Sequence, residues 1–279
     1  FLMTAREAYE VLSTQLTNIY DDRESSTIAR YLVEDLFSKS FWSEDELSTE
    51  ELILLDDAKE RLMGHEPWQY VGGYADFYGC KFKVDPSVLI PRPETEELVY
   101  LALDIIKREK INSVLDIGTG SGIIPITIAK KTERLRIYAV DISKSALEKA
   151  RENSKLLETN VEFLETDFLN SGLWSDLPKV DLVISNPPYI TASEKEQMHP
   201  NVLEHEPHIA LFVQFDAMEF YKAIASFVMD HQDFGCKVLV EINENFGTDV
   251  CDTFRTAGLK NIVLIKDLQD KNRIVAAEK

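Results

Sequence analysis

One tetrapeptide, Asn186-Pro187-Pro188-Tyr189, has the residue types and the order needed to hold a planar amino group. Two consecutive prolines fix φ and remove two backbone N–H donors, so carbonyl oxygens dominate the local polar surface. The Asn186 side-chain oxygen and the Pro187 carbonyl can then accept both N–H bonds of an NH2 group, while Tyr189 offers a flat face for stacking. We therefore expect Asn186, Pro187 and Tyr189 to carry the chemistry.

Such a site favours attack by a weakly nucleophilic nitrogen. A carboxamide nitrogen is a poor nucleophile because its lone pair is delocalised into the carbonyl. Two preplaced acceptors would stabilise the positive charge that builds on the nitrogen as it attacks, and an in-line arrangement of the reactants would lower the barrier further. The tetrapeptide specifies an NH2 group on a planar conjugated carbon. It does not separate glutamine from adenine or cytosine.

A second constellation combines a glycine loop with an acidic residue on the next apolar run. The apolar run that contains Asp116 leads into Gly118-Thr119-Gly120-Ser121-Gly122, and closely spaced glycines let the backbone turn sharply and approach a ligand. A dinucleotide fingerprint would need a small residue at position 123, which is Ile123. The next run ends in Asp141, whose carboxylate can accept hydrogen bonds from both hydroxyls of a ribose. The spacing suits a ligand without a pyrophosphate, such as S-adenosylmethionine.

Both constellations need a sheet to bring them together. From residue 113 onward, short apolar runs alternate with helical stretches, which is typical of a largely parallel sheet covered on both faces. The expected strands are 113–117, 136–140, 161–164, 181–185, 237–242 and 261–265, and the expected helices are 123–131, 144–157, 216–229 and 246–256. Ligands bind beyond the carboxyl ends of such strands, so we expect Asn186 beside the glycine loop.

The first third of the chain has a different pattern. Apolar residues recur every three or four positions between residues 4 and 63, which predicts helices, and Ser48 followed by Glu51 predicts a capped helix start. Residues 71–84 alternate apolar and polar types, which predicts a β-hairpin. We expect three parts: a small all-α domain at 1–70, a β-hairpin linker at 71–90 and an α/β domain at 91–279.

The glycine loop and Asp141 together resemble the cofactor site of the class I methyltransferases. The resemblance implies a seven-stranded, mostly parallel sheet with one antiparallel strand near its edge. It also implies S-adenosyl-L-methionine as the methyl donor and S-adenosyl-L-homocysteine as the product. The cofactor-binding residues expected on this basis are Asp116, Gly118, Thr119, Gly120, Ser121, Gly122, Asp141 and Asn186.

Three further segments, at 66–73, 89–98 and 206–211, narrow the resemblance. With the glycine loop and Asn186-Pro187-Pro188-Tyr189, they look like the bacterial and organellar peptide chain release factor glutamine methyltransferases over nearly the whole chain. The Pro-Arg-Pro-Glu-Thr-Glu segment at 91–96 is not shared with DNA adenine methyltransferases generally. The resemblance implies methylation of the side-chain amide nitrogen, N5, of the glutamine in the Gly-Gly-Gln motif of class I release factors, which modulates translation termination.

The same resemblance gives roles to further residues. Asp167 and Phe168 would lie along the adenine of the cofactor. The glutamine would be bound by Asn186, Pro187, Pro188 and Tyr189, and the entrance would be shaped by Arg92, Glu206 and Pro207. Two departures from the family pattern are a missing glycine within residues 212–218 and a Gly235-Cys236 pair where two glycines are usual.

Composition and charge limit the other classes of protein. The net charge is −19, and proteins that grip a phosphate backbone usually present a basic face, so we expect no direct binding of nucleic acid. No apolar run approaches the length of a membrane span, and the first residues lack a signal-peptide pattern. Three scattered cysteines, Cys80, Cys236 and Cys251, fit a reducing compartment. We therefore expect a cytoplasmic monomer.

The acidic residues are unevenly distributed. Residues 1–85 hold 8 Lys and Arg against 18 Asp and Glu, a net charge of −10. A glutamine side chain alone offers little to distinguish it from every other glutamine, so specificity needs a second contact region. We expect the acidic helical domain to dock the release factor away from its glutamine loop, with complementary charge steering the encounter.

Two alternatives remain open at this point. An amino-methyltransferase acting on adenine or guanine of DNA or rRNA would be expected to carry a basic patch or a target-recognition insert. A binding-only adaptor would be expected to have lost Asp141, Asn186 or the glycine spacing, and all are intact. His199, His205 and His208 cluster in one region, but no second ligand motif supports them, so we expect no metal site.

Overall fold

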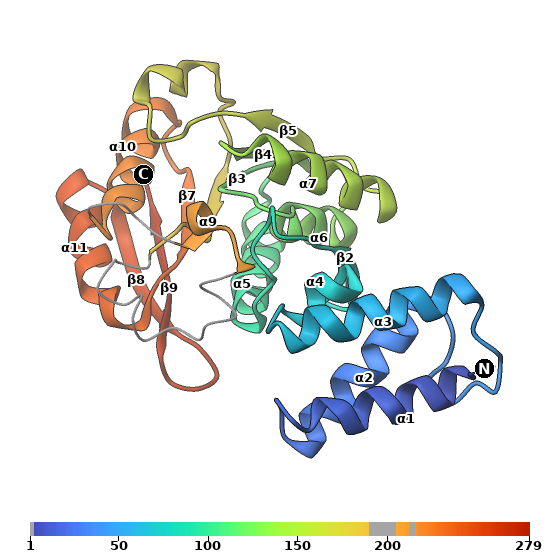
Figure 1. Cartoon of the computed structure of the whole chain (residues 1–279). Coiled ribbons are helices and arrows are strands. Elements are labelled where there is room, and N and C mark those ends of the chain that lie inside the picture. The colour runs from blue at the N-terminus through green and yellow to red at the C-terminus, as the bar shows by residue number, and fades with distance from the viewer. Residues whose placement is uncertain (1–2, 190–204, 212–215) are drawn as a thin grey trace. The chain divides into compact units, whose positions relative to one another are not determined.

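Alternating apolar runs and helices from residue 113 onward build one sheet of seven strands (Figure 1). The computed structural model describes residues 3–189, 205–211 and 216–279 of the chain. The strand order is β5-β4-β3-β6-β7-β9-β8. The strands are β3 (Ser113–Ile117), β4 (Arg136–Asp141), β5 (Glu162–Glu165), β6 (Leu182–Ser185), β7 (Lys237–Glu241), β8 (Lys260–Lys266) and β9 (Asn272–Glu278).

The sheet is mostly parallel. Strands β5, β4, β3, β6 and β7 pair in parallel, whereas β9 is antiparallel to both β7 and β8. The predicted seven-stranded sheet with one antiparallel strand near its edge is therefore confirmed. The run of apolar residues in β9 is short and flanked by polar residues such as Asn272 and Glu278, and the sequence pattern did not identify it as a separate strand.

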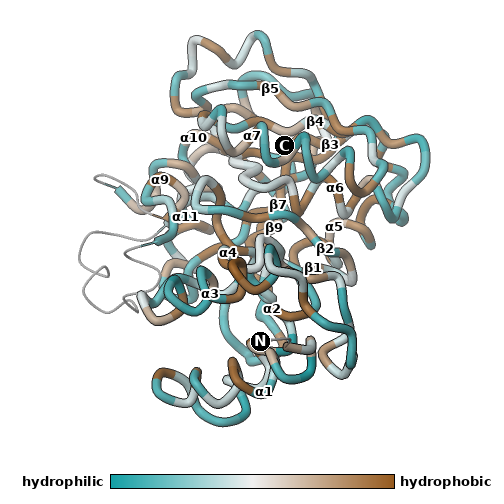
Figure 2. The backbone as a smooth tube through the Cα atoms, turned by 45° about the vertical axis from the view of Figure 1, so that its right-hand side comes forward, coloured by the Kyte–Doolittle hydropathy of each residue, from teal (hydrophilic) through white to brown (hydrophobic). Residues whose placement is uncertain are grey.

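Helices cover both faces of the sheet because successive strand residues point to opposite sides. On one face, Leu115 and Val183 join a core that includes Tyr221 and Phe254 from two C-terminal helices. On the other face, Val114 packs with residues of the helices that flank β3. The helices of this part are α5 (Pro93–Glu109), α6 (Ile123–Lys131), α7 (Lys144–Leu156), α9 (His208–Leu211), α10 (Glu219–His231) and α11 (Gly247–Ala257). In Figure 2 parts of β7 and β9 are brown, the colour of hydrophobic residues.

The predicted helix at 216–229 starts later than expected. In the structure α10 begins at Glu219 because the backbone N–H of Met218 bonds to the Asp216 side chain, and Glu219 N–H bonds to the Asp216 carbonyl. Asp216 therefore belongs to the turn that precedes the helix. Short 3-10 helices at Ser171–Asp176 and Glu244–Phe246 complete the connections.

The N-terminal part forms four helices, α1 (Ala5–Leu16), α2 (Asp22–Phe37), α3 (Thr49–Met63) and α4 (Trp68–Gly72). The predicted helix start at Ser48 is confirmed, since the Ser48 side chain accepts from Glu51 N–H and the Glu51 carboxylate accepts from Ser48 N–H. The helices enclose a core of their own that includes Leu12, Leu32 and Leu62. This part therefore has the hydrophobic interior that a separate helical domain requires.

The predicted hairpin at 71–84 is wrong at its start. Val71 and Gly72 belong to α4, which ends where Gly73 adopts a left-handed φ of 75°. Only β1 (Tyr74–Phe77) and β2 (Cys80–Lys83) form the two-stranded sheet. The prediction began the hairpin too early, because over three or four residues the sequence pattern of a helical turn cannot be told from that of a strand.

Contacts divide the described chain into two compact units. One contains residues 3–75, Val84–Pro86 and His205, and the other contains Asp76–Lys83 and the described residues from 87 to 189 and from 206 onward. The predicted domain boundaries at residues 70 and 90 stay predictions. None of the described helices is long and apolar enough to cross a membrane. The three cysteines are free thiols.

Candidate functional site

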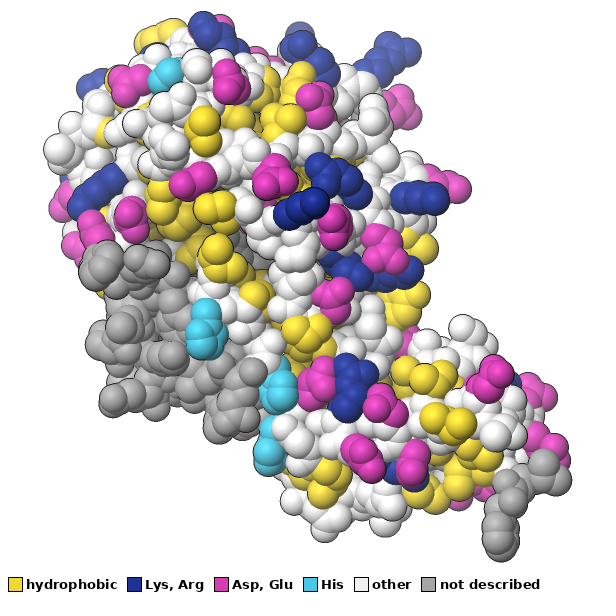
Figure 3. Space-filling view, turned by 45° about the horizontal axis from the view of Figure 1, so that its top comes forward, with side chains coloured by type: hydrophobic (Ala, Val, Ile, Leu, Met, Phe, Trp, Pro, Cys, Tyr) yellow, Lys and Arg dark blue, Asp and Glu magenta, His cyan; other side chains and the backbone are white. Residues whose placement is uncertain are grey.

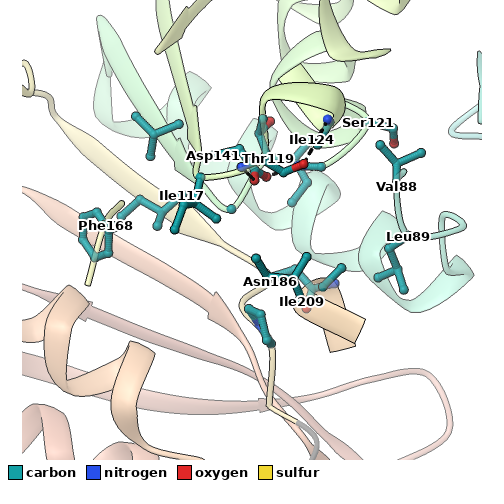
Figure 4. Close-up of a pocket in the computed structure, with 18 of the residues that line it drawn as sticks. Val88, Leu89, Ile117, Thr119, Ser121, Ile124, Asp141, Phe168, Asn186 and Ile209 are labelled. Atoms are coloured by element: carbon teal, nitrogen blue, oxygen red, sulfur yellow. Dashed lines mark hydrogen bonds between the residues drawn. The ribbon is translucent and has the colours of Figure 1, made fainter. Parts of the chain in front are cut away.

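A cavity of about 760 Å³ opens at the carboxyl ends of β3, β4 and β6. Figure 4 shows Thr119 and Asp141 on one side of the cavity, and Asn186 with Ile209 of α9 on another. Predicted residues that line this cavity are Arg92, Gly118, Thr119, Gly120, Ser121, Asp141, Asp167, Phe168, Asn186 and Pro188. The structure thus brings the glycine loop and Asn186 to one space.

The three loop glycines have different surroundings. All have a left-handed φ, 74° at Gly118, 54° at Gly120 and 81° at Gly122. A Cβ added at Gly118 or Gly120 would meet no protein atom within 4 Å, so both glycines leave space against the cavity that they line. At Gly122 an added Cβ would lie 2.7 Å from the Ile126 side chain and 3.1 Å from the Ala150 Cβ, so this glycine permits close helix packing.

Asp141 ends β4 and lies under the loop. Its Oδ2 accepts from the backbone N–H of Gly120 at 2.8 Å, and its Oδ1 accepts from the N–H of Ser143 at 2.9 Å. Burial raises the pKa of Asp141 above its ordinary value, and these backbone hydrogen bonds oppose that shift. Each oxygen keeps a second acceptor position, so the carboxylate can still accept from the hydroxyls of a ribose.

Asp116 is a buried carboxyl group directly before the loop. Neither of its oxygens, nor the Thr119 hydroxyl, has a hydrogen-bond partner that satisfies normal geometry within the described residues. Burial raises the pKa of Asp116 to about 7; the nearby Thr119 hydroxyl lowers it, and the charge of Asp141 raises it. Buried polar groups without partners are rare in folded proteins. Thr119 lines the cavity and Asp116 does not, so the Thr119 hydroxyl is the one of these groups that a polar ligand in the cavity could contact.

The Asn186 side chain is held by a residue that the sequence analysis did not single out. Its Nδ2 donates to the hydroxyl oxygen of Thr95, 3.1 Å away. Thr95 is buried in the first turn of α5 and itself lines the cavity. Pro187 and Tyr189 are not among the cavity-lining residues, and Tyr189 packs against the core of the first sheet face. Burial raises the pKa of the Tyr189 hydroxyl, with the carboxylate of Glu241 adding to the shift.

Arg92 and Glu206 form an ion pair beside the cavity. Arg92 Nη2 lies 2.6 Å from Glu206 Oε1, and Glu206 Oε2 accepts from the backbone N–H of Ile90 at 3.3 Å. The Glu206 side chain is only 2% exposed. The pair therefore joins the segment before α5 to the segment before α9. Pro207 follows directly, and its carbonyl accepts from the N–H of Ala210 in α9.

Asp167 and Phe168 follow β5 and line the other side of the cavity. Asp167 Oδ1 accepts from Leu169 N–H at 3.1 Å. Phe168 is almost fully buried against Trp174 and Phe227, and its carbonyl accepts from the Trp174 ring N–H at 2.8 Å. The loop is thus built on a packed aromatic base.

Two more buried residues, absent from the sequence predictions, support the site. Asn153 of α7 donates to the carbonyls of Ser121 and Lys83, each 3.0 Å away, and so ties the glycine loop to β2. Glu241 ends β7 and is 2% exposed; burial raises its pKa to about 7, and the nearby Thr95 hydroxyl lowers it. Neither residue lies in a recognisable sequence motif. They are distinguished only in the structure, where both are polar side chains that are buried.

Some predicted features lie outside the described residues, namely His199 and residues 212–215 of the loop without glycine. His205 and His208 are described, and no group of three potential metal ligands occurs in the described part of the chain. Gly235 adopts a φ of 89°, and its N–H bonds to the Lys279 carbonyl. Gly235-Cys236 therefore forms an ordinary tight turn before β7.

Comparisons with known proteins give a consistent assignment. The model of the methyltransferase small domain matches residues 99–207. The release factor glutamine methyltransferase of Lactococcus lactis subsp. lactis is 36% identical over 273 residues, covering 96% of this chain and 98% of the relative. The protein of the same name from Streptococcus pneumoniae is 40% identical over 241 residues, covering 85% of this chain and 84% of the relative.

Solved structures share the fold at low sequence identity. A methyltransferase from Pyrococcus furiosus superposes with a TM-score of 0.53 at 17% identity, covering 80% of this chain and 98% of that one. The hMettl16 catalytic domain, solved in complex with the MAT2A 3′UTR hairpin 1, gives a TM-score of 0.58 at 13% identity, covering 83% and 81%. At these identities the likeness concerns the fold alone.

Proposed function

Because the chain belongs to the release factor glutamine methyltransferases, we propose that it transfers a methyl group from S-adenosyl-L-methionine to the N5 amide nitrogen of a glutamine in a class I peptide chain release factor. The glutamine is that of the Gly-Gly-Gln motif. The observation that carries this proposal is that Asn186 and the glycine loop line one cavity at the ends of the paired strands β3 and β6.

The proposed cofactor residues fit the donor by shape and by polarity. Gly118 and Gly120 leave space that a Cβ would fill, and Asp141 offers acceptors for a ribose. The Thr119 hydroxyl lines the cavity and has no partner among the described residues, whereas the unpartnered oxygens of Asp116 lie outside the cavity lining. When bound, S-adenosyl-L-methionine supplies an electrophilic methyl group on a sulfonium. Asp167 and Phe168 would border the adenine.

Asn186 would hold and activate the substrate amide. Its Nδ2 is bonded to Thr95, which leaves its Oδ1 to accept an N–H of the glutamine side chain. The Pro187 carbonyl would accept the second N–H. Both acceptors stabilise the positive charge that develops on nitrogen during attack. No strong base is needed beforehand, because the nitrogen becomes acidic only after it has been methylated.

Arg92, Glu206 and Pro207 would shape the entrance that admits the glutamine loop. The Arg92–Glu206 ion pair fixes the two chain segments beside the cavity. Pro188 lines the cavity beside Asn186, and Tyr189 follows it. Glu206 is buried whereas the Arg92 side chain is 35% exposed, so replacing Arg92 would leave a buried carboxylate without its charged partner.

The nucleic-acid alternative is not favoured. The net charge of −19 opposes contact with a phosphate backbone, and relatives named for release factor glutamine methylation match most of the chain. The RNA hairpin in the hMettl16 complex is a ligand of that protein and does not bear on the substrate of this chain.

Methyl transfer from a radiolabelled donor tests the proposal directly. The full-length protein is incubated in parallel with a class I release factor, the same factor with the Gly-Gly-Gln glutamine replaced, duplex DNA and rRNA. Label in the intact factor alone supports the proposal. Label in nucleic acid, or equal label in the factor that lacks this glutamine, overturns it.

A further inference from the structure

One side-chain amide, that of Asn153 on α7, makes three hydrogen bonds to two segments that lie far from it in the sequence. Its Nδ2 donates to the carbonyl of Ser121 in the glycine loop and to the carbonyl of Lys83 at the end of β2, each 3.0 Å away. Its Oδ1 accepts from the backbone N–H of Lys83 at 2.7 Å. Asn153 is fully buried, so water does not compete for these bonds.

The three partners fix the orientation of this amide. Both Nδ2 hydrogens are directed at backbone carbonyls, and Oδ1 faces a backbone N–H. A reversed amide would place its oxygen against two carbonyl oxygens and its NH2 group against an N–H, so all three bonds would be lost. An aspartate at position 153 would offer acceptors alone, and a leucine of similar size would offer no polar atom.

The carbonyl of Ser121 lies where α6 itself supplies no donor. Gly122 is the N-cap of α6, and its own carbonyl accepts from the N–H of Ile126. The residue four positions after Ser121 is Pro125, which has no N–H. Ser121 is 3% exposed, and a buried backbone carbonyl without a partner is costly. Asn153 therefore satisfies a group that the local sequence leaves open.

The glycine loop is thus attached to other elements at both ends. Near its start, backbone N–H groups of the loop donate to the end of β4. At its far end, Asn153 holds the Ser121 carbonyl. Gly118 and Gly120 have a left-handed φ and great conformational freedom, so a loop held at one end alone would visit other conformations. A ligand binds more weakly when only a fraction of the protein has the competent conformation.

We propose that Asn153 is a positioning residue that holds the glycine loop in the conformation that binds S-adenosyl-L-methionine, and that it couples this loop to the end of β2. The inference rests on the proposed function, in which the loop binds the methyl donor. Ser121 lines the cavity, whereas Asn153 and Lys83 are not among the lining residues, so Asn153 acts through the loop. Because coupling is reciprocal, a ligand that orders the loop should also stabilise the bond at Lys83.

Asn153→Leu removes all three hydrogen bonds at similar side-chain size and is the first test. We expect the Kd for S-adenosyl-L-homocysteine, measured by isothermal titration, to rise roughly 5- to 20-fold, because the loop loses one of its attachments. The KM for the donor should rise to a similar extent, while kcat with saturating donor stays within about twofold of wild type. Loss of folded protein alone would lower kcat and leave this KM unchanged.

Two control variants separate the effect on the loop from an effect on stability. Ser154→Ala removes hydrogen bonds to Thr159 from the next residue of α7. Lys83→Met removes the ion pair with Glu152 and keeps the backbone groups that bind Asn153. Both controls should leave the Kd within about twofold of wild type, whatever their effect on Tm. A rise in Kd for Ser154→Ala equal to that for Asn153→Leu would overturn the inference, since a general loosening of α7 would explain both.

Amide hydrogen exchange, followed by NMR in the unmodified protein, tests the coupling without any substitution. Saturating S-adenosyl-L-homocysteine should slow the exchange of the Lys83 N–H by roughly threefold or more. The control is the N–H of Tyr78, which lies in the turn of the same hairpin and donates to the Glu96 carboxylate. Unchanged exchange at Lys83, or equal slowing at Tyr78, would overturn the coupling.

The outcomes distinguish this inference from the proposed function. A wild-type protein that binds S-adenosyl-L-homocysteine but labels no release factor contradicts the proposed substrate, and the titrations still decide the role of Asn153. A wild-type protein that labels the release factor, together with an Asn153→Leu variant of unchanged Kd, overturns the positioning role alone. If Asn153→Leu does not fold, the exchange of the Lys83 N–H in the wild-type protein decides the inference.

Discussion

Asp141 at the end of β4 accepts a hydrogen bond from the backbone N–H of Gly120, 2.8 Å away in the loop that follows β3. The acidic residue and the glycine loop are therefore one structural unit, joined further by bonds from Gly118 and Thr119 N–H to the carbonyl of Val140. This coupling makes the loop conformation depend on the residue proposed to bind the ribose.

We expect Asp141→Ala to weaken S-adenosyl-L-methionine binding by about 1.5–3 kcal/mol, because hydrogen bonds to a charged acceptor are lost. Isothermal titration with the folded variant measures the effect. Asp230→Ala is the matched control, since Asp230 is an exposed residue of α10 away from the cavity. Unchanged affinity in folded Asp141→Ala would remove the ribose assignment.

The loop glycines allow a paired test. Gly120→Ala should abolish most cofactor binding, because its Cβ would enter the space beside the cavity, while the positive φ adds about 1–2 kcal/mol of strain. Gly122→Ala carries the same strain and also pushes against Ile126, which adds about 1–3 kcal/mol of destabilisation.

Thermal unfolding and titration with the cofactor distinguish the two glycines. Gly122→Ala should show the larger fall in Tm, and Gly120→Ala the larger loss of affinity relative to its fall in Tm. The opposite ranking would mean that Gly122, and not Gly120, faces the ligand.

Asn186→Ala should lose methyl transfer by about 10²–10³-fold, the usual effect of removing one preorganised electrostatic partner, while cofactor affinity survives. Single-turnover kinetics with saturating donor measures the chemical step separately from binding. A rate within tenfold of wild type would show that the amide nitrogen is held elsewhere.

Stability should depend on pH through Asp116. Its pKa is raised to about 7 from an ordinary value of 3.8, mainly by burial. The folded state thus binds the proton more tightly than the unfolded chain does, so the stabilising contribution is complete below about pH 3.8 and is lost as the pH rises to about 7.

Urea unfolding of wild type and Asp116→Asn checks this sign. The free energy of unfolding of wild type relative to Asp116→Asn should fall between about pH 4 and about pH 8, by on the order of a few kcal/mol. The comparison with the variant cancels the other titrating groups. A constant difference across this range would contradict a raised pKa for Asp116.

The N-terminal helical unit presents a candidate docking surface on α3. Asp56, Asp57 and Glu60 are exposed there, alongside the exposed apolar residues Ile53 and Leu54. Figure 3 shows acidic and hydrophobic side chains interspersed on this unit. Neutralising the three acidic residues as Asp56→Asn/Asp57→Asn/Glu60→Gln should lower kcat/KM for the intact release factor by roughly threefold to tenfold at low salt.

A short peptide that carries Gly-Gly-Gln should be methylated equally by wild type and by this variant, because the peptide lacks the part of the release factor that would contact α3. The control Asp230→Asn/Asp249→Asn/Asp252→Asn removes the same charge from exposed positions on α10 and α11. The difference should disappear near 1 M salt, where screening extends over only about 3 Å. An equal loss of kcat/KM in both triple variants would mean that the net charge of the protein matters and that α3 is not a docking surface.

Local sequence signals were enough to predict several helices and strands and the place of Asn186. The predicted strand 113–117 and helix 123–131 coincide with β3 and α6, because a short, mostly apolar run followed by glycines and a helical pattern leaves few alternatives. The Ser48 and Glu51 pair marked the start of α3 for the same local reason. The position of Asn186 beside the glycine loop also followed from sequence, since parallel strands bring their carboxyl ends to one edge.

Tertiary structure alone decided which residues support those motifs. Asn186 and Thr95 are 91 residues apart and meet because α5 packs against β7, the neighbour of β6 in the sheet. Gly122 looks like its neighbours in the sequence, yet Ala150 of α7 makes it a packing residue. In the sequence Glu241 looks like any other acidic residue, and only the structure shows that its carboxyl group is buried away from water. Hydrogen bonds and burial between distant segments leave no periodic trace in the chain, so only the folded arrangement assigns them.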